Sequence, residues 1–346
     1  MTVLPETHEA VGQLEAGAAL SAFQLPTRKP GTAVTVWIVD FRLADPQYPF
    51  VVGENLVGDV VAVGEGVTDV KPGDKVLSFS FVPENYGKAS QEYALLSKWV
   101  VGKLPDNISP EEGVTVSDNL VTAYYSLFDQ LGLPVPPALP AIIPPEGADS
   151  PVLIWGAGGS AGQYSVQLLS LAGYKSIFAI ASSRHHDYLR SLGATHTFDY
   201  NSPNVTDEIL AAAGGPIKHV LDAVGDEENS LKPISKIAGG KLAFLLPVRV
   251  GGAGAVQGVK RTTDLPFAEG VQLIPIATRF YDKNSHLKTD LQPHIIPDLL
   301  RRGLVKPNRY REVQGANLLE RVSTAVDLLR RGAVSGERLV FRVAKD

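Results

Sequence analysis

The segment Val152-Leu-Ile-Trp-Gly156-Ala-Gly158-Gly159-Ser-Ala-Gly162 sets the architecture expected of this chain of 346 residues. Four apolar residues, typical of a buried strand, lead into a glycine cluster, and a segment with helical apolar spacing follows. Glycines at such a turn allow a tight bend and a close approach to a pyrophosphate, which the amides at a helix start can bind. The pattern predicts a dinucleotide site, and the alternative is a tight turn without a ligand. The predicted phosphate-binding residues are Gly156, Gly158, Gly159, Ser160, Ala161 and Gly162.

Strands and helices are expected to alternate after this turn, which is typical of a parallel sheet covered by helices. The expected strands are 152–155, 176–181, 219–223 and 241–246. The expected helices are 160–171, 186–192, 206–213 and 228–238.

The end of the second expected strand, Ala181-Ser182-Ser183-Arg184, indicates which dinucleotide binds. NAD-binding proteins usually carry an acidic residue about 20 residues beyond the glycines, whereas a basic residue suits the 2′-phosphate of NADPH. Here Asp187 is the first acid, while Arg184 can pair with a phosphate and both serines can donate hydrogen bonds. The sequence therefore favours NADPH; the alternative for Arg184 is a solvated surface cation. Further along, the residues expected near the nicotinamide, or else packed at strand ends, are Val224, Leu246 and Pro247.

The chain before residue 117 is expected to contain short strands and turns without intervening helices, at 34–39, 58–63, 75–81 and 92–96. Pro72-Gly73 forms a turn that feeds the third of these strands. This spacing favours an antiparallel or barrel-like module. After Pro275 the sequence predicts helices at 292–302 and 316–331 and a last strand at 338–343.

The composition excludes several classes of protein. There is no cysteine, which removes disulfide scaffolds, cysteine-rich zinc sites, iron–sulfur clusters and cysteine nucleophiles. The 32 basic and 37 acidic residues give a charge of −5, unlike the basic footprint of a nucleic-acid-binding protein. No run of about 18 apolar residues suits a membrane span, and the N-terminus lacks signal-peptide features, so a cytoplasmic location is expected.

These motifs together resemble the medium-chain dehydrogenase/reductase superfamily, specifically its zinc-free quinone reductase and enoyl reductase branch. The segments that carry the resemblance are Pro49-Phe-Val-Val-Gly53, Gly58-Asp-Val-Val-Ala-Val-Gly64, Val70-Lys-Pro-Gly-Asp-Lys-Val76, Gln91-Glu-Tyr-Ala94, Thr122-Ala-Tyr124, the Gly156 turn, Leu192-Gly-Ala194, Leu221-Asp-Ala-Val-Gly225 and Val334-Ser-Gly-Glu-Arg-Leu-Val340. The resemblance implies a mixed α/β protein: a GroES-like β-barrel catalytic domain over 1–117, an inserted Rossmann-fold cofactor domain over 118–280, and a C-terminal return to the catalytic domain over 281–346.

More narrowly, three segments are similar to fungal trans-acting enoyl reductases that partner polyketide synthases: the proline-rich segment 133–150, Ala181-Ser182-Ser183-Arg184 and Phe198-Asp-Tyr200. This likeness implies hydride transfer from NADPH to the activated C=C bond of an enone or enoyl (thio)ester, on a small-molecule or carrier-bound acyl substrate. Two alternatives stay open: an NADPH:quinone oxidoreductase, and a non-catalytic NADPH-binding protein with a degenerate substrate site. The assembly is expected to be a monomer or a homodimer.

The family also implies roles for single residues. Ser182, Arg184 and Tyr200 match positions that serve the adenosine phosphate, and Thr122 would reach the nicotinamide ribose or amide; Ser183 is predicted to bind the cofactor because its hydroxyl can donate a hydrogen bond. Tyr124 is a candidate to donate a proton or stack on the cofactor, although an aromatic residue at that helical spacing also suits a core.

Two departures from the family pattern stand out. Zinc-containing members carry Gly-His-Glu where this chain has Gly53-Glu54-Asn55, and they supply a cysteine ligand, so no metal is expected here. The passage that usually ends in Asn-Pro-Val-Asp-Trp-Lys is compressed into Thr35-Val-Trp-Ile-Val-Asp-Phe-Arg42. Arg42 is the candidate cation for an enolate oxygen, with a surface ion pair as the alternative. The compression could reshape the substrate pocket or weaken catalysis.

Overall fold

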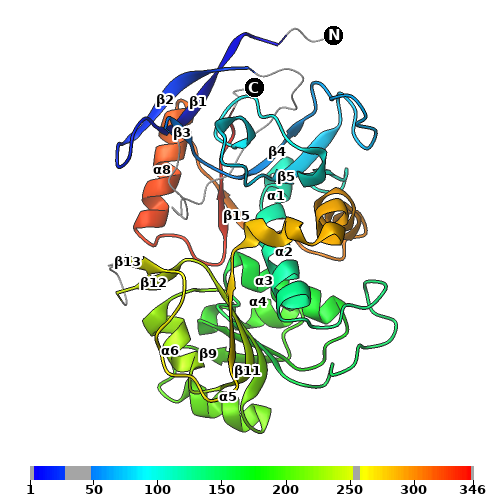
Figure 1. Cartoon of the computed structure of the whole chain (residues 1–346), viewed down its shortest axis with the longest axis vertical. Helices are drawn as coiled ribbons and strands as arrows, with labels where there is room; N and C mark the ends of the chain where they lie inside the picture. The colour runs from blue at the N-terminus through cyan, green and yellow to red at the C-terminus, as the bar shows by residue number, and fades with distance from the viewer. Residues whose placement is uncertain (1–3, 28–47, 252–257, 344–346) are drawn as a thin grey trace. The chain divides into compact units, whose positions relative to one another are not determined.

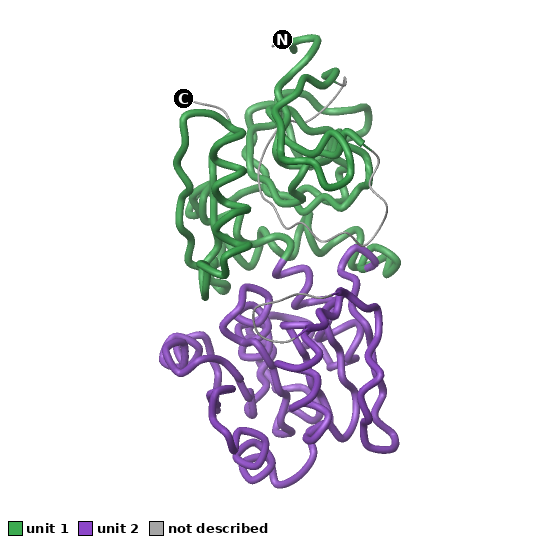
Figure 2. Tube along the Cα trace, turned by 90° about the vertical axis from the view of Figure 1, so that its left-hand side faces the viewer, with its two compact units in different colours: residues 1–118, 281–346 green, residues 119–280 purple. Residues whose placement is uncertain are grey.

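The structure, a computed structural model, describes residues 4–27, 48–251 and 258–343. It divides into two compact units (Figure 2): unit 1 comprises residues 1–118 and 281–346, and unit 2 comprises residues 119–280. Unit 1 therefore combines both ends of the chain, with unit 2 inserted between them. The expected strand 34–39, the candidate Arg42 and the compressed passage lie outside the described residues.

Unit 2 is built on a six-stranded parallel sheet with the order β14-β11-β10-β7-β8-β9. Strands β9 and β11 of this sheet are labelled in Figure 1. Its strands are β7 (Val152–Trp155), β8 (Ile177–Ala181), β9 (His196–Asp199), β10 (Ile217–Asp222), β11 (Ala238–Leu245) and β14 (Gln272–Ile276). The chain builds outward from β7 in one direction and then from β10 in the other. The boundary between β7 and β10 is thus a topological switch point, where open sheets of this kind bind ligands. The predicted Rossmann-type sheet is confirmed.

Helical segments connect these strands. They are α3 (Ser160–Leu171), α4 (His186–Ser191), α5 (Val205–Ala213), the π-helix η5 (Glu227–Leu231), α6 (Lys232–Ile234) and the 3-10 turn η4 (Ser183–His185), preceded by α2 (Ser117–Tyr124) and the π-helix η3 (Tyr125–Gln130). A small antiparallel hairpin, β12 (Val248–Val250) with β13 (Gly258–Lys260), follows β11.

The expected limits of β7 and α3 are confirmed to the residue. The prediction of a helix over 228–238 is wrong at its end, because Ala238 already pairs with Ile217 as the first residue of β11. The two glycines that follow lie against β10, where a Cβ on Gly240 would stand 2.4 Å from the carbonyl oxygen of Lys218. Close packing of two strand backbones therefore ends the helix early.

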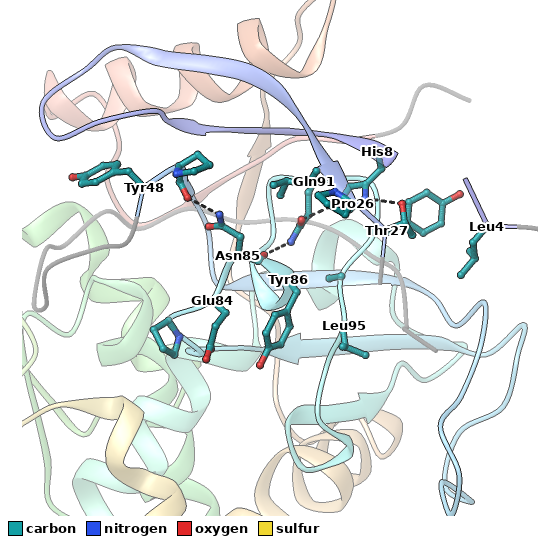
Figure 3. A pocket seen from close by; sticks show the side chains of 15 residues that line it. Leu4, His8, Pro26, Thr27, Tyr48, Glu84, Asn85, Tyr86, Gln91 and Leu95 are labelled. Carbon is teal, nitrogen blue, oxygen red and sulfur yellow. Dashed lines mark hydrogen bonds between the residues drawn. The ribbon is translucent and has the colours of Figure 1, made fainter. Parts of the chain in front are cut away.

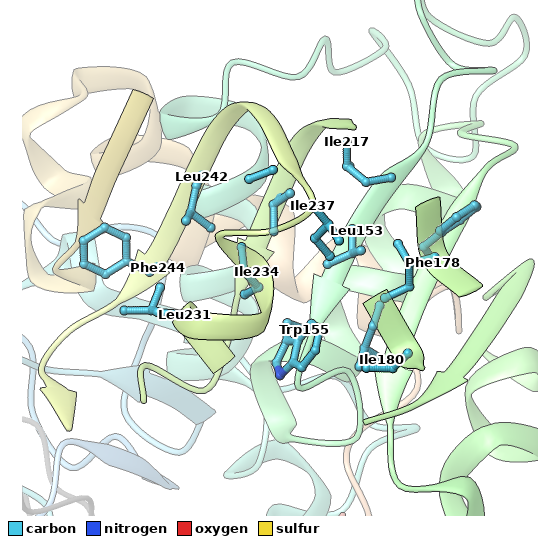
Figure 4. Packing of buried hydrophobic residues seen from close by; sticks show 14 of the residues in the cluster. Leu153, Trp155, Phe178, Ile180, Ile217, Leu231, Ile234, Ile237, Leu242 and Phe244 are labelled. Atoms are coloured by element: carbon cyan, nitrogen blue, oxygen red, sulfur yellow. The ribbon is translucent and has the colours of Figure 1, made fainter. Parts of the chain in front are cut away.

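One face of the sheet buries an apolar cluster (Figure 4). Trp155 and Leu153 of β7 and Phe178 of β8 contribute from the sheet, and Ile209 of α5 and Ile234 of α6 cover them. Successive side chains of a strand point to opposite faces, so Ile154, which is also fully buried, faces the other side. Burial on both faces explains why β7 reads as a continuous apolar run.

The described part of unit 1 contains three small sheets. One is antiparallel, β2 (Leu20–Pro26), β1 (Thr7–Gln13) and β3 (Phe50–Val51); the second is antiparallel, β4 (Asn55–Asp59), β5 (Lys75–Phe79) and β6 (Val101–Lys103); and the third pairs β15 (Tyr310–Glu312) with β16 (Arg338–Val340) in parallel. Its helical segments are η1 (Asn85–Gly87), η2 (Lys98–Val100), α1 (Pro110–Gly113), η7 (Leu287–Ile295), α7 (Ile296–Arg301) and α8 (Leu318–Arg330), and the 3-10 segment η6 (Thr278–Lys283) crosses the limit between the units.

Two expectations for this unit change. The predicted strand 92–96 is wrong, because the backbone N–H of Leu95 turns back to the carbonyl oxygen of Tyr86 at 2.6 Å instead of pairing along a ladder. The predicted strand 58–63 ends at Asp59 and begins earlier, at Asn55.

The buried side chain of Gln292, in the C-terminal part of unit 1, is hydrogen-bonded to strand β5 of the N-terminal part. The Gln292 carboxamide accepts from the N–H of Phe79 at 2.8 Å and donates to its carbonyl oxygen at 3.0 Å, and it also donates to the Tyr281 hydroxyl at 2.7 Å. Gln292 thereby completes the hydrogen bonding at the last residue of β5. Across the described residues, no helix has the length and apolar character needed to cross a bilayer.

Candidate functional site

The glycine turn 156–162 links β7 to α3 at the carboxyl edge of the unit 2 sheet. Gly156 has φ of +81°, a conformation that favours glycine, and its N–H and that of Ala157 both donate to the carbonyl oxygen of Ile180. A Cβ on Gly162 would stand 2.4 Å from the Gly156 carbonyl oxygen. Helix α3 can therefore pass this close to the turn only with glycine at that position.

The start of α3 suits an anion. Its N-cap residue, Gly159, brings no side chain to the first helical amides and is itself exposed. Gln163, which is buried, donates from Nε2 to the Gly158 carbonyl oxygen at 2.8 Å and holds the turn from within. A helix start without a side-chain cap and a tight glycine turn together fit a pyrophosphate. These residues would hold the phosphates of a dinucleotide.

The predicted adenosine-phosphate residues follow the ends of two neighbouring strands. Ser182 is half-buried, and Ser183 and Arg184 are exposed, directly after β8. Tyr200 lies directly after β9, which pairs with β8, and the residue is 47% exposed. The structure therefore places these residues together at the carboxyl edge of the sheet, where the neighbouring strands β8 and β9 end.

The carboxylate at the end of β9, Asp199, is occupied by local hydrogen bonds. It accepts from the N–H of Asn201 at 2.9 Å, from that side chain's amide at 2.8 Å and from the N–H of Ser183 at 3.2 Å. These bonds, chiefly that from the Asn201 backbone, lower the pKa of Asp199. Asp199 thus holds the Ser183 turn in place.

The residues expected near the nicotinamide follow β10 and β11. Val224 lies against the glycine turn, since a Cβ on Gly156 would stand 2.5 Å from its Cγ2 atom. Leu246 is half-buried and donates its N–H to the Ile276 carbonyl oxygen at 2.9 Å, and Pro247 is buried. Of these three, Val224 is the residue in direct reach of the glycine turn.

The two candidates on α2 are both buried within unit 2. The Thr122 hydroxyl lies 2.8 Å from that of Thr278, a residue 156 positions later. Tyr124 packs edge-on against Phe128 with ring centroids 4.8 Å apart, and burial raises the pKa of its hydroxyl. The surroundings of Tyr124 match the core aromatic that the helical spacing also allowed.

The residues that replace the family's metal-binding pair are held in unit 1 by polar contacts. The Glu54 carboxylate lies 3.0 Å from the ammonium of Lys88, whose side chain is almost fully buried. Asn55 accepts from the N–H of Asp118 at 2.9 Å and donates to that side chain at 3.2 Å. Within the described part of the chain, no group of three His, Asp or Glu residues is arranged to hold a metal.

Unit 1 also contains a cavity of about 340 Å³ (Figure 3). Its polar wall includes His8 and Gln91, both buried, with His8 Nε2 3.1 Å from Gln91 Oε1. Thr122 and Tyr124 are not among the residues that line it.

Two buried polar residues beside the candidate dinucleotide site were not among the site residues predicted from the sequence. Gln163 has a buried side-chain amide on the first turn of α3. The signal for it in the sequence was a polar residue among apolar neighbours. Asp222 is the fully buried last residue of β10, and its position at a strand end was visible without any sign of its partners.

Comparisons with known proteins agree with this architecture. The family model described as "Alcohol dehydrogenase GroES-like domain" matches residues 30–106, and that described as "Zinc-binding dehydrogenase" matches residues 161–242. A "Trans-enoyl reductase" of Gibberella fujikuroi is 29% identical over 357 aligned residues, covering 96% of this chain and 97% of that protein. "Dehydrogenase pigH" of Monascus ruber is 31% identical over 318 residues, covering 85% and 83%.

The fold is shared with solved structures. A quinone oxidoreductase from Pseudomonas syringae pv. Tomato DC3000 superposes with a TM-score of 0.71 at 19% identity, covering 96% of this chain and 99% of the other. The predicted combination of a GroES-like domain with a Rossmann-fold domain is thereby confirmed. From the parallel sheet with its glycine turn and from these relatives together, we conclude that the chain belongs to the medium-chain dehydrogenase/reductase superfamily of nicotinamide-dependent oxidoreductases.

Proposed function

We propose that this protein is an NADPH-dependent reductase that transfers a hydride to the activated C=C bond of an enone or an enoyl thioester, without zinc. The observation that carries the proposal is the dinucleotide site of unit 2, in which an uncapped helix start, a glycine turn and Arg184 follow two adjacent strands. The similarity to a trans-enoyl reductase across nearly the whole chain supports the enoyl substrate.

NADPH is favoured over NADH by the residues that follow β8. The segment Ser182-Ser183-Arg184 offers hydroxyls and a guanidinium, which suit a 2′-phosphate, and it contains no carboxylate. The nearby carboxylate of Asp199 already accepts three hydrogen bonds from Ser183 and Asn201. NAD sites usually have an acidic side chain that binds the ribose hydroxyl. The residues that follow β8 and β9 therefore do not supply such a side chain.

The bound cofactor would supply the hydride. The protein therefore has to bind the cofactor and the substrate, orient them toward each other and exclude water from the site. Hydride addition to the β carbon moves the C=C electron pair toward the carbonyl, which gives an enolate; a proton from solvent then reaches the α carbon. Arg42 remains the candidate for binding the enolate oxygen, and Thr122 the candidate for orienting the nicotinamide side of the cofactor. The buried hydroxyl of Thr122 can hold one orientation through Thr278.

The zinc-free part of the proposal rests on Glu54 and Asn55. Glutamate is a possible zinc ligand, yet here its carboxylate is paired with the buried ammonium of Lys88 at 3.0 Å. A cation at that distance competes with a metal for the same oxygen atoms. Asn55, where zinc members have glutamate, pairs with Asp118.

The substrate class is best tested by following NADPH oxidation with 2-enoyl thioesters, simple enones and quinones. We expect turnover of the thioesters or enones, unchanged by a chelator, with a carrier-bound acyl chain from a polyketide synthase as the natural form. Turnover of quinones alone would indicate a quinone oxidoreductase. Tight NADPH binding without turnover of any compound would indicate a non-catalytic protein.

A further inference from the structure

Asp222 is a buried carboxyl group that the proposed chemistry does not use. It is the last residue of β10, it is 0% exposed, and it lies at the carboxyl edge of the sheet beside the switch point. Burying a carboxylate is costly unless it is hydrogen-bonded, so its partners indicate what it does.

The carboxylate of Asp222 holds the turn formed by residues 223–225. One oxygen, Oδ1, accepts from the backbone N–H of Val224 at 2.9 Å and of Gly225 at 3.3 Å. The other, Oδ2, accepts from the hydroxyl of Ser230 at 2.7 Å, which anchors the carboxylate to the buried side of η5. Two backbone amides and one hydroxyl therefore fix both oxygens.

The same turn contacts the two neighbouring turns of the sheet edge. On one side, Val224 packs against Gly156 of the glycine turn 156–162. On the other, the Gly225 carbonyl oxygen accepts from the N–H of Arg249 at 2.8 Å, after the end of β11, and a Cβ on Gly225 would meet the Leu245 carbonyl oxygen at 2.4 Å. The turn formed by residues 223–225 therefore lies between the glycine turn 156–162 and the residues that follow β11.

This location assigns the turn to one half of the dinucleotide. In a doubly wound sheet each half of the dinucleotide lies over one half of the sheet. Here the β7 and β8 side carries the glycine turn and Arg184, so the β10 and β11 side receives the nicotinamide half.

We propose that Asp222 is a positioning residue for the nicotinamide half of the cofactor, acting through the backbone of Val224 and Gly225. The inference rests on the proposed dinucleotide site. It differs from a general structural role because loss of Asp222 should affect nicotinamide binding and leave adenosine binding intact.

The first test measures the affinity of the full-length protein for NADPH and for adenosine 2′,5′-bisphosphate, which lacks the nicotinamide half. We expect Asp222→Ala to weaken NADPH binding at least about tenfold, as for loss of hydrogen bonds to a charged group, and to change bisphosphate binding less than about twofold. Asp222→Asn should bind NADPH nearly as the unmodified protein does, because its amide oxygen can still accept from Val224 and Gly225.

Asp226→Ala is the matched control, since Asp226 is also buried but its carboxylate accepts from Glu228 and Asn229 at the start of η5. It should lower stability without changing the ratio of the two affinities. Equal losses for both ligands in Asp222→Ala, or no loss for either, would overturn the role of Asp222 while leaving the proposed function intact. If the unmodified protein bound neither ligand, the proposed function would fail with it.

A second measurement needs no cofactor and covers the case in which Asp222→Ala folds poorly. Hydrogen exchange of the Val224 and Gly225 amides should be slow in the unmodified protein and in Asp222→Asn, and faster in Ser230→Ala, where the carboxylate loses its anchor. Exchange at Val220, in the middle of β10, should stay unchanged in all three proteins. Rapid exchange of Val224 and Gly225 in the unmodified protein would contradict the inference.

Discussion

The proposed preference for NADPH over NADH rests on Arg184, which lies in η4, three residues after the end of β8. We expect Arg184→Ala to weaken NADPH binding roughly 10- to 100-fold, because a charged hydrogen bond to the 2′-phosphate is lost, and to leave NADH binding within about twofold. Titration calorimetry with both cofactors measures the two affinities.

Arg190 supplies the matched control for this prediction. It is an exposed arginine six residues later, on α4, and it pairs with Asp187 at 2.8 Å. Arg190→Ala should change neither affinity. Equal losses for NADPH and NADH in Arg184→Ala would show that the guanidinium does not bind the 2′-phosphate.

Asp222 should also make stability depend on pH. Burial raises the pKa of Asp222 to about 6, although its hydrogen bonds from Ser230, Val224 and Gly225 and the charge of Arg249 act in the opposite direction. A carboxyl whose pKa is higher in the folded state binds its proton more tightly there. Its contribution to stability is therefore complete below its unfolded pKa of about 3.8 and is lost as pH rises through about 6.

The expected effect is a difference between two proteins. Relative to Asp222→Asn, which cannot ionise, the free energy of unfolding of the unmodified protein should fall by roughly 1 kcal/mol between about pH 5 and about pH 7.5. Urea unfolding at several pH values measures it. Parallel pH profiles for the two proteins would mean that the pKa of Asp222 is ordinary in the folded state.

At the scale of the element, the packing of α3 onto β7 requires α3 to pass very close to the glycine turn that joins them. Gly162→Ala should abolish dinucleotide binding and destabilise unit 2 by roughly 1–3 kcal/mol, because its Cβ would be forced against the Gly156 carbonyl oxygen. Thermal unfolding and NADPH titration measure both effects.

Gly258→Ala is the control for this substitution. Among the described residues, no atom lies within 4 Å of a Cβ position on Gly258, on β13, so the alanine should be accommodated without loss of stability or binding. Normal NADPH binding by Gly162→Ala would show that the turn does not form the phosphate site.

Elements were predictable where local signals agreed. The limits of β7 and α3 follow directly from an apolar run, a glycine cluster and helical spacing within 20 residues. The helix expected over 228–238 ended early because β11 starts at Ala238, and this pairing with Ile217 depends on a strand about 20 residues upstream. Short segments such as β9 carry too little pattern to be separated from loops.

At the scale of the whole molecule, each unit has its own buried core, and such units commonly unfold separately. We expect urea to produce two transitions, and adenosine 2′,5′-bisphosphate to shift only that of unit 2, since a ligand stabilises the state that binds it. Trp155, which is buried in unit 2, and Trp99 in unit 1 report the two transitions by fluorescence.

Variants Trp155→Phe and Trp99→Phe, each combined with Trp37→Phe to remove the third tryptophan of the chain, separate the two signals. A single transition seen by both tryptophans, and shifted as a whole by the bisphosphate, would show that the units unfold as one cooperative body.

The Rossmann-type sheet with its glycine turn, and the return of the C-terminal segment to unit 1, could be predicted from the sequence alone, because glycine turns, strand–helix alternation and family motifs are patterns of neighbouring residues. The hydrogen-bond partners of the buried polar groups could not be predicted from the sequence. Gln292 meets Phe79 across 213 positions, Thr122 meets Thr278 across 156, and Asp222 meets Ser230 only after η5 folds back over β10. A hydrogen bond needs its two atoms within about 3 Å, and such proximity between distant residues is created by tertiary folding, which no local pattern records.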